Sequence, residues 1–156
     1  FTGSAQTGKT FLARRVEALL VADSRHAYLL EGENLLQGLD ADLSAADPSF
    51  AAERVRRYGE VARLLIDTGL IVVSTSKTFG INYQRMAEMI RTLVQPAPVI
   101  AVHMSRAGEE PPPNTDLHFA GPQDFDAAAR QILEELKRRG VLIQPSGTKS
   151  TIQYSI

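Results

Sequence analysis

The sequence predicts a single α/β domain in which a parallel β-sheet lies between two layers of helices. Short apolar runs of strand length alternate along the chain with segments of helical periodicity, an order typical of a sheet whose connections cross over its faces. The apolar runs are continuous, as in strands that are buried on both sides. A glycine-rich loop also stands between the first strand and the first helix. In such folds, ligands bind at the carboxyl ends of the strands.

The composition is that of one soluble globular domain. Of the 156 residues, 44% are hydrophobic and 22% are charged, and no signal peptide or membrane span is visible. The formal charge of −1 lacks the basic footprint of a nucleic-acid-binding protein. Cysteine is absent, which excludes disulfides and thiolate metal sites and fits a reducing compartment. We therefore expect a cytoplasmic protein whose partners include neither nucleic acid nor a membrane.

The first elements surround the glycine-rich loop. Phe1 and Thr2 lead straight into the loop, so we expect that most of the first strand precedes Phe1 and that the numbering starts inside a longer protein. Residues 9–21 carry apolar side chains at helical spacing and form the first predicted helix. Residues 26–30 follow as a short buried strand.

A long middle helix opens at Pro48-Ser49 and ends at Gly69, since proline favours a helix start and glycine a helix end. Its exposed face is predicted to be basic at Arg54, Arg56 and Arg57. Residues 70–74 form the next buried strand. The helix after it passes through Met86 and Met89, which we predict to fill the core.

Two strands and a helix complete the predicted order. The strands are residues 98–104 and 116–119, and the loop between them contains Gly108 and three prolines. The last helix starts near Phe125 and closes at Gly140. We expect a domain over residues 1–143, followed by a polar tail, residues 144–156, with a short strand at 151–154.

The glycine-rich loop has the full pattern of a phosphate-binding loop. Glycines let consecutive backbone N–H groups point into one concavity, and the helix N-terminus adds a favourable dipole. Lys9 is expected to reach the β- and γ-phosphates as a catalytic residue, and the Thr10 hydroxyl to bind Mg²⁺. The residues that we predict to hold a nucleotide are Gly3, Ser4, Ala5, Gln6, Thr7, Gly8, Lys9 and Thr10.

Two carboxylates follow the second strand, in the segment Glu31-Gly-Glu33-Asn34. This position lies at the carboxyl edge of the sheet, where a phosphoryl acceptor must bind. One carboxylate could accept the proton of an attacking hydroxyl, and the other could hold metal-bound water. The alternative is a helix cap, because acidic residues and Asn are common at strand-to-helix turns. Together with the phosphate loop, the pattern favours the catalytic interpretation.

Three segments resemble the adenylylsulfate kinases, which use MgATP to phosphorylate the 3′-hydroxyl of adenosine 5′-phosphosulfate. Residues 28–43 resemble the family's Leu-Asp-Gly-Asp-Asn-Val-Arg-His-Gly-Leu block, and residues 56–72 its Arg-Arg-Ile-Gly-Glu-Val-Ala helix with the strand after it. Residues 131–140 are similar to its closing helix. The resemblance implies a three-layer P-loop kinase fold, ATP and Mg²⁺ as cofactors, and a role in sulfate assimilation. On this basis Lys9, Glu31 and Glu33 are expected to be catalytic and Asn34 to contact the substrate.

The departures from the family pattern fall where the family holds its acceptor. Glu31 and Glu33 replace two Asp, Leu36 replaces a substrate-binding Arg, and Ala45 replaces a Phe that packs on the substrate base. Residues 105–116 replace a basic helical lid. A lid excludes water from the transferring phosphate and supplies positive charge to the transition state, so its loss is expected to lower the rate.

Other basic residues offer a substitute grip on the acceptor. Lys77, in the Ser-Lys-Thr-Phe turn after the third strand, and Arg54 are the candidate substrate residues, with Arg56 and Arg57 beside Arg54. The alternative is that these arginines form a solvated helix face. The three histidines, His26, His103 and His118, lack ligand spacing and are predicted to be structural.

Three functions therefore compete. The first is a kinase of the adenylylsulfate type, as one domain of a larger sulfate-activating protein, fused to or associated with a sulfate adenylyltransferase domain and able to form a homodimer. The second is a kinase-derived domain that binds nucleotide or a partner domain without turnover. The third is a kinase for a different small anionic acceptor.

Overall fold

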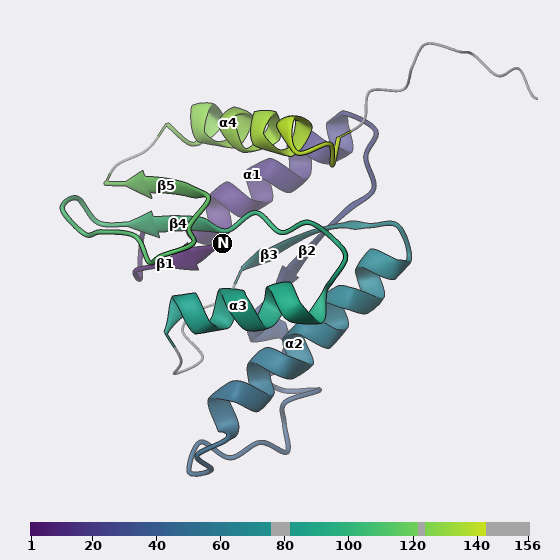
Figure 1. Cartoon of the computed structure of the whole chain (residues 1–156), viewed down its shortest axis with the longest axis vertical. Helices are drawn as coiled ribbons and strands as arrows, with labels where there is room; N and C mark the ends of the chain where they lie inside the picture. The colour runs from purple at the N-terminus through teal and green to yellow at the C-terminus, as the bar shows by residue number, and fades with distance from the viewer. Residues whose placement is uncertain (76–81, 122–123, 143–156) are drawn as a thin grey trace, which may run out of the picture.

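The computed structural model describes residues 1–75, 82–121 and 124–142. Parallel strands lie between helices, and the predicted three-layer α/β fold is confirmed (Figure 1). Lys77 and the strand predicted at 151–154 lie outside the described residues. In chain order the elements are β1 (Thr2–Gly3), α1 (Lys9–Ala22), β2 (Ala27–Glu31), the short 3-10 helix η1 (Gly32–Leu35), α2 (Phe50–Asp67), β3 (Ile71–Thr75), α3 (Tyr83–Leu93), β4 (Val102–Ser105), β5 (Leu117–Ala120) and α4 (Phe125–Arg138).

The strands pair in two hydrogen-bonded parts, β1-β4-β5 and β2-β3, and every pairing is parallel. Gly3 pairs with Met104 in the first part, and Glu31 pairs with Thr75 in the second. The backbone nitrogen of Phe1 lies 2.6 Å from the Ser74 carbonyl oxygen, and this contact links the two parts. An apolar cavity of about 220 Å³ lies between them. Because all strands run the same way, their carboxyl ends meet at one edge.

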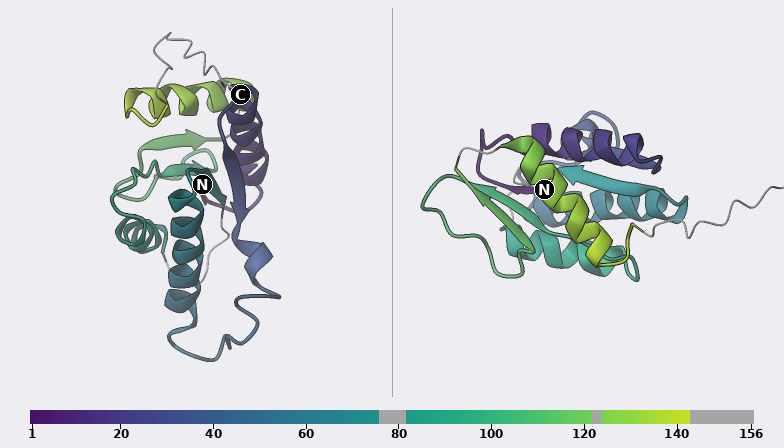
Figure 2. Two further views of the ribbon diagram at one scale, coloured as in Figure 1. Left: turned by 90° about the vertical axis from the view of Figure 1, so that its right-hand side faces the viewer. Right: turned by 90° about the horizontal axis from the view of Figure 1, so that it is seen from above.

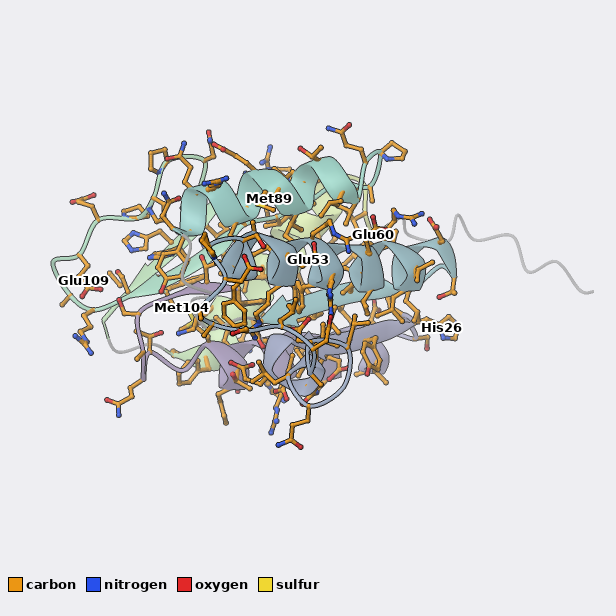
Figure 3. The ribbon with its side chains drawn as sticks, turned by 90° about the horizontal axis from the view of Figure 1, so that it is seen from below. His26, Glu53, Glu60, Met89, Met104 and Glu109 are labelled. Atoms are coloured by element: carbon orange, nitrogen blue, oxygen red, sulfur yellow. The ribbon has the colours of Figure 1, made fainter. Side chains whose placement is uncertain are left out.

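Two hydrophobic cores hold the layers together. Helices α1 and α4 lie side by side on one face of the strands, and α2 and α3 lie together on the other, as the three views agree (Figures 1 and 2). Leu12, Val16 and Ile132 are buried in the first core. Met86 is buried in the second core. The partly buried Met89, labelled on α3 in Figure 3, packs against that core. The prediction that both methionines fill the core is confirmed.

The three helices whose bounds the sequence predicts, α1, α2 and α4, begin and end within two residues of those bounds, but the fourth strand does not. It begins at Val102 rather than at residue 98. Pro98 has no N–H to donate, and Ala101 donates its N–H to the Asp116 carboxylate at 2.6 Å. The prediction of a seven-residue strand was therefore wrong at its start. Within the described ranges, no helix combines the length and apolar character needed to cross a bilayer.

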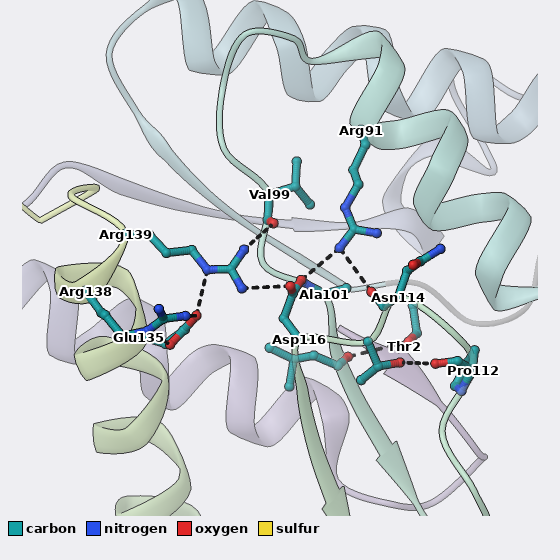
Figure 4. A network of polar contacts seen from close by, with 12 residues as sticks. Thr2, Arg91, Val99, Ala101, Pro112, Asn114, Asp116, Glu135, Arg138 and Arg139 are labelled. Atoms are coloured by element: carbon teal, nitrogen blue, oxygen red, sulfur yellow. Dashed lines mark hydrogen bonds and ion pairs between the residues drawn. The ribbon is translucent and has the colours of Figure 1, made fainter.

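Asp116 fixes the edge of the sheet opposite the carboxyl ends of the strands. Its carboxylate accepts hydrogen bonds from Arg91 of α3 at 2.8 Å and from Arg139, just after α4, at 2.7 Å (Figure 4). Burial by itself would raise the pKa of Asp116, but the bond from the Ala101 N–H and those two guanidinium groups hold it below its usual value. One carboxylate thus joins helices from both faces of the sheet.

Candidate functional site

The glycine-rich loop leaves the sheet at Gly3, a position that only glycine can occupy. Its φ is +129°, and a Cβ there would stand 1.8 Å from the Met104 carbonyl oxygen. The next residue continues the ladder, because the Ser4 N–H donates to that same carbonyl at 3.0 Å. The Tyr83 hydroxyl of α3 donates to the Gly3 carbonyl at 2.7 Å. The start of the loop is therefore held by β4 and by α3.

The loop ends at Gly8, which caps helix α1. Gly8 has φ +85°, and a Cβ there would meet the Phe125 ring at 2.6 Å. Its carbonyl accepts the first helical bond, from the Leu12 N–H at 2.9 Å. The first turn of α1, which starts with Lys9 and Thr10, contains no acidic residue. The positive end of the helix dipole is thus available for an anion.

Lys9 and Thr10 stand where the sequence places them. The Lys9 ammonium donates to the Ser4 carbonyl oxygen at 2.5 Å, so its side chain folds back over the loop. The Thr7 hydroxyl donates to the same carbonyl at 2.9 Å. Thr10 is exposed in the first turn of α1. The Lys9 ammonium, the Thr7 hydroxyl and the start of α1 therefore meet at the glycine-rich loop.

A hollow of about 530 Å³ adjoins the loop. This volume is in the usual range for small-molecule sites. One wall is the loop itself, and the other is formed by residues that follow β4 and β5. The lining residues are Gln6, Thr7, Gly8, Ser105, Arg106, Ala107, Gly121 and Phe125.

The predicted acidic pair follows β2 at the same edge of the sheet. Glu31 ends the strand, and its Oε1 lies 3.1 Å from Nη2 of Arg14. Because Arg14 is one helical turn beyond Thr10, this ion pair brings Glu31 to the phosphate-loop end of α1. Glu33 and the exposed Asn34 belong to the short helix η1.

Tyr58 of α2 holds the ends of β2 and β3 together. Its hydroxyl donates to the Leu30 carbonyl at 2.8 Å and lies 3.1 Å from the Thr75 carbonyl oxygen. Burial raises the pKa of Tyr58, so the phenol is neutral at ordinary pH. The edge that carries Glu31 is therefore fixed from the α2 side as well.

The arginines of α2 that were predicted to hold the substrate are engaged in ion pairs. Arg54 was expected on an exposed basic face, and this was wrong: its side chain is 11% exposed and its Nε lies 3.3 Å from Oδ2 of Asp40. Arg57 bonds Asp42 and Glu53 instead of presenting a free charge. The periodicity of α2 does not reveal that Arg54 is buried by the segment containing Asp40, which precedes the helix.

Several polar contacts around the loop are not predicted by the sequence. The Ser4 hydroxyl donates to Glu109 Oε2 at 2.6 Å. Thr2 Oγ1 lies 3.0 Å from His103 Nδ1, and Ser105 Oγ lies 2.8 Å from His118 Nε2. Burial, with His118 and Lys9 nearby, lowers the pKa of His103. These partners stand far apart along the chain, so no local pattern signals them.

The fold and the loop together define a class. An α/β domain with this glycine-rich loop between a parallel strand and a helix is a P-loop protein. A family model described as adenylylsulphate kinase matches residues 1–111. That match covers more than half of the chain, and the chain belongs to the adenylylsulphate kinase family.

Individual relatives agree with this assignment. An adenylyl-sulfate kinase of Vibrio cholerae is 30% identical over 172 residues, covering 91% of this chain and 78% of the relative. One from Aeromonas hydrophila is 42% identical over 94 residues, covering 60% of this chain and 46% of the relative. The chain spans about half the length of that relative and of the Geotalea daltonii enzyme, of which it covers 50%.

A solved structure supports the fold. A mutant of the APS kinase CysC from Mycobacterium tuberculosis superposes with a TM-score of 0.71 at 29% identity, over 88% of this chain and 94% of that one. Another structure of CysC, in complex with AMPPNP and APS, gives a TM-score of 0.70 at 24% identity. The second likeness bears on the fold alone.

Proposed function

We propose that this chain is an ATP-dependent phosphotransferase that transfers the γ-phosphoryl group of ATP to the 3′-hydroxyl of adenosine 5′-phosphosulfate. The observation that carries the proposal is the complete phosphate loop, Gly3 to Thr10, at the start of α1 in a member of this family. The transfer forms a bond between the acceptor oxygen and phosphorus and breaks the bond to the bridging oxygen of ADP.

The donor side uses the loop, the helix and the hollow. Backbone N–H groups of the loop and the dipole of α1 bind the phosphates. Lys9 leaves the Ser4 carbonyl and pairs with the β- and γ-phosphates, where its charge offsets the negative charge that develops on ADP. The hollow next to the loop then takes the nucleoside.

The residues present fit a Mg²⁺ ion that arrives with the nucleotide. Mg²⁺ prefers oxygen ligands and commonly takes only one or two from the protein, with phosphates and water as the rest. The exposed hydroxyl of Thr10 is such a ligand, in the first turn of α1. When bound, the ion neutralises charge on the phosphate oxygens.

The acceptor side is formed by the edge that follows β2. Glu31 or Glu33 accepts the proton of the attacking hydroxyl, and Asn34 contacts the substrate. Lys77 stays a candidate substrate residue from the sequence. Arg54 stays one too, although its ion pair with Asp40 supports a structural role.

A coupled assay that follows ADP formation tests the proposed reaction. With MgATP and adenosine 5′-phosphosulfate, we expect ADP and the 3′-phosphorylated product in equal amounts. Absence of acceptor-dependent ADP at high enzyme and substrate concentrations would refute the kinase. Lys9→Ala is the matched control, since ADP formation that is as fast with this variant as with the unmodified chain would come from a contaminant.

A second candidate function is nucleotide binding without turnover. The observation that favours it is the connection from β4 to β5, residues 106–116, which has no helix and is fastened to the phosphate loop by Glu109. Calorimetry separates the two functions, because this alternative predicts binding of ATP and ADP with no affinity for adenosine 5′-phosphosulfate. A panel of phosphorylated and sulfated metabolites would reveal a different acceptor.

The cellular setting of the chain is also a proposal. Membership of the adenylylsulphate kinase family supports a role in sulfate activation. We propose that this role is carried out in the cytoplasm, next to a sulfate adenylyltransferase domain. Association as a homodimer is proposed from the same resemblance. Light scattering of the purified chain and co-purification with a sulfate adenylyltransferase test these two associations.

A further inference from the structure

Glu109 connects the phosphate loop to the segment that follows β4. Its Oε2 accepts a hydrogen bond from the Ser4 hydroxyl at 2.6 Å and another from the Arg106 N–H at 3.0 Å. Ser4 belongs to the loop and Arg106 follows β4 directly. One carboxylate oxygen therefore joins two segments that are about a hundred residues apart. In Figure 3, Glu109 lies at the opposite end of the molecule from His26, which precedes β2.

The turn that carries Glu109 is closed on itself. The Glu109 N–H donates to the Arg106 carbonyl at 3.2 Å, and Gly108 adopts φ +85°, a conformation that favours glycine. The buried Ser105 hydroxyl lies 3.2 Å from the carbonyl oxygens of both Arg106 and Glu109. It also lies 2.8 Å from Nε2 of His118 on β5. Residues 106–109 are thus anchored to β4 and β5 on one side and to Ser4 on the other.

This turn is one wall of the hollow next to the loop. Arg106 and Ala107 line the hollow from the turn, and Gln6, Thr7 and Gly8 line it from the loop. The bond between Ser4 and Glu109 spans from one wall to the other. It fixes the separation of the two walls without covering the phosphate loop with a lid.

Glu109 is charged under ordinary conditions. The hydrogen bond from Ser4, followed by that from the Arg106 N–H, lowers the pKa of Glu109 below its usual value. Bonds from neutral donors to an ionised carboxylate are stronger than bonds between two neutral groups. The residue is exposed to solvent, which limits its effect to a moderate one.

We propose that Glu109 is a positioning residue whose carboxylate ties the phosphate loop to residues 106–109 and thereby holds the wall against which the nucleoside of a bound nucleotide packs. The inference rests on the proposed function only in that a nucleotide binds at the phosphate loop. It predicts that Glu109 contributes to the affinity for the nucleoside part of the ligand and not to the affinity for its phosphates.

Calorimetry with two probes, ATP and inorganic tripolyphosphate, tests the inference on the full chain. Glu109→Ala should weaken ATP binding by about fivefold, the effect of an exposed charge-assisted contact, and leave tripolyphosphate binding within about twofold. Glu109→Gln keeps an oxygen acceptor for Ser4 and should restore most of the ATP affinity. Glu110→Ala, which removes the neighbouring exposed carboxylate, is the matched control and should bind both probes as the unmodified chain does.

A double-mutant cycle adds a measurement that a general loss of stability would not reproduce. Ser4→Ala should weaken ATP binding by itself, and Ser4→Ala with Glu109→Ala should cost no more than the larger single change, because both remove the same contact. Thermal unfolding of each variant checks that the fold is retained.

Three results would overturn the inference. They are an unchanged ATP affinity in Glu109→Ala, an equal loss for ATP and tripolyphosphate, or tighter binding of both probes by Glu109→Gln, which would show charge repulsion instead of positioning. If the unmodified chain bound neither probe, the proposed function would fail first and would take the inference with it. The unmodified chain therefore separates the two failures.

Discussion

Nε of Arg54 lies 3.3 Å from Oδ2 of Asp40, and the two side chains are 11% and 2% exposed. Arg54 belongs to α2, while Asp40 belongs to the segment that leads from η1 to that helix. Oδ1 of Asp40 has no hydrogen-bond partner among the described residues. The pair is therefore a buried attachment of this segment to α2, and removing one member leaves the other charge buried without this partner.

Asp40→Ala should lower the free energy of unfolding by about 3 kcal/mol, because it leaves the Arg54 guanidinium buried without this carboxylate. Urea denaturation measures the effect. Asp42→Ala is the matched control: it removes a carboxylate from the same segment, but one whose pair with Arg57 is 67% exposed on the aspartate side, so little change is expected. Equal losses in the two variants would contradict a special role for the buried pair.

Asp116→Asn should cost about 2 kcal/mol at neutral pH, since the amide cannot attract Arg91 and Arg139 as the carboxylate does. The pKa of Asp116 is lowered in the folded chain, so the unfolded chain binds more protons at low pH. The stabilisation is fully present above the unfolded pKa of about 3.9 and is lost as the pH falls through the lower folded value.

Urea titrations at several pH values follow this loss, and the difference between the unmodified chain and Asp116→Asn should shrink below about pH 4. Asp67→Asn is the matched control at neutral pH: its carboxylate is 62% exposed and 3.4 Å from Arg63, so its removal should change the free energy of unfolding little. A difference that grew as the pH fell would mean that the sign of the pKa shift is wrong.

Thr10→Ala should remove most of the benefit of Mg²⁺ to ATP binding. We expect an affinity loss of about tenfold with Mg²⁺ present and none in the presence of a chelator, because the hydroxyl serves the ion and not the phosphates. Thr10→Ser keeps the hydroxyl and should behave like the unmodified chain. An equal loss with and without Mg²⁺ would assign Thr10 to the phosphates.

Glu31→Gln and Glu33→Gln identify the general base. The variant that lacks the base should lose about 100-fold in kcat with its ATP affinity unchanged. Since Glu31 also pairs with Arg14, Arg14→Ala separates the two roles. If Arg14→Ala reproduced the loss of Glu31→Gln, Glu31 would act through its position and not as a proton acceptor.

Much of the fold follows from local patterns. The apolar run at residues 70–74 predicts β3. Glycine is common just after a helix end because it tolerates positive φ, so Gly69 and Gly140 predict two helix ends. Both adopt positive φ in the structure, at +88° and +72°. The length of β4 could not be predicted the same way. A strand exists only where a neighbour supplies the ladder, and β5 pairs with β4 from Val102 to Ser105.

In the site, too, contiguous patterns are predictable from the sequence, and contacts between distant segments are not. The phosphate loop is a contiguous pattern whose geometry is set by Gly3 and Gly8, so the sequence predicts it in full. Glu109 was overlooked because its partner Ser4 lies 105 residues earlier in the chain. Arg54 was predicted to be exposed because the segment that buries it, which contains Asp40, precedes its helix. Contacts between distant segments depend on how the layers pack.

The most direct test of the account is calorimetric titration of ATP, with Mg²⁺, into the unmodified chain and into Lys9→Ala. The phosphate loop predicts one ATP site in the unmodified chain and a loss of about 100-fold in Lys9→Ala, as expected for removal of a charge-assisted contact to phosphate. Lys137→Ala, on the exposed end of α4, should bind like the unmodified chain. If Lys9→Ala bound ATP as tightly as the unmodified chain, or if neither bound it, the loop would not be the nucleotide site.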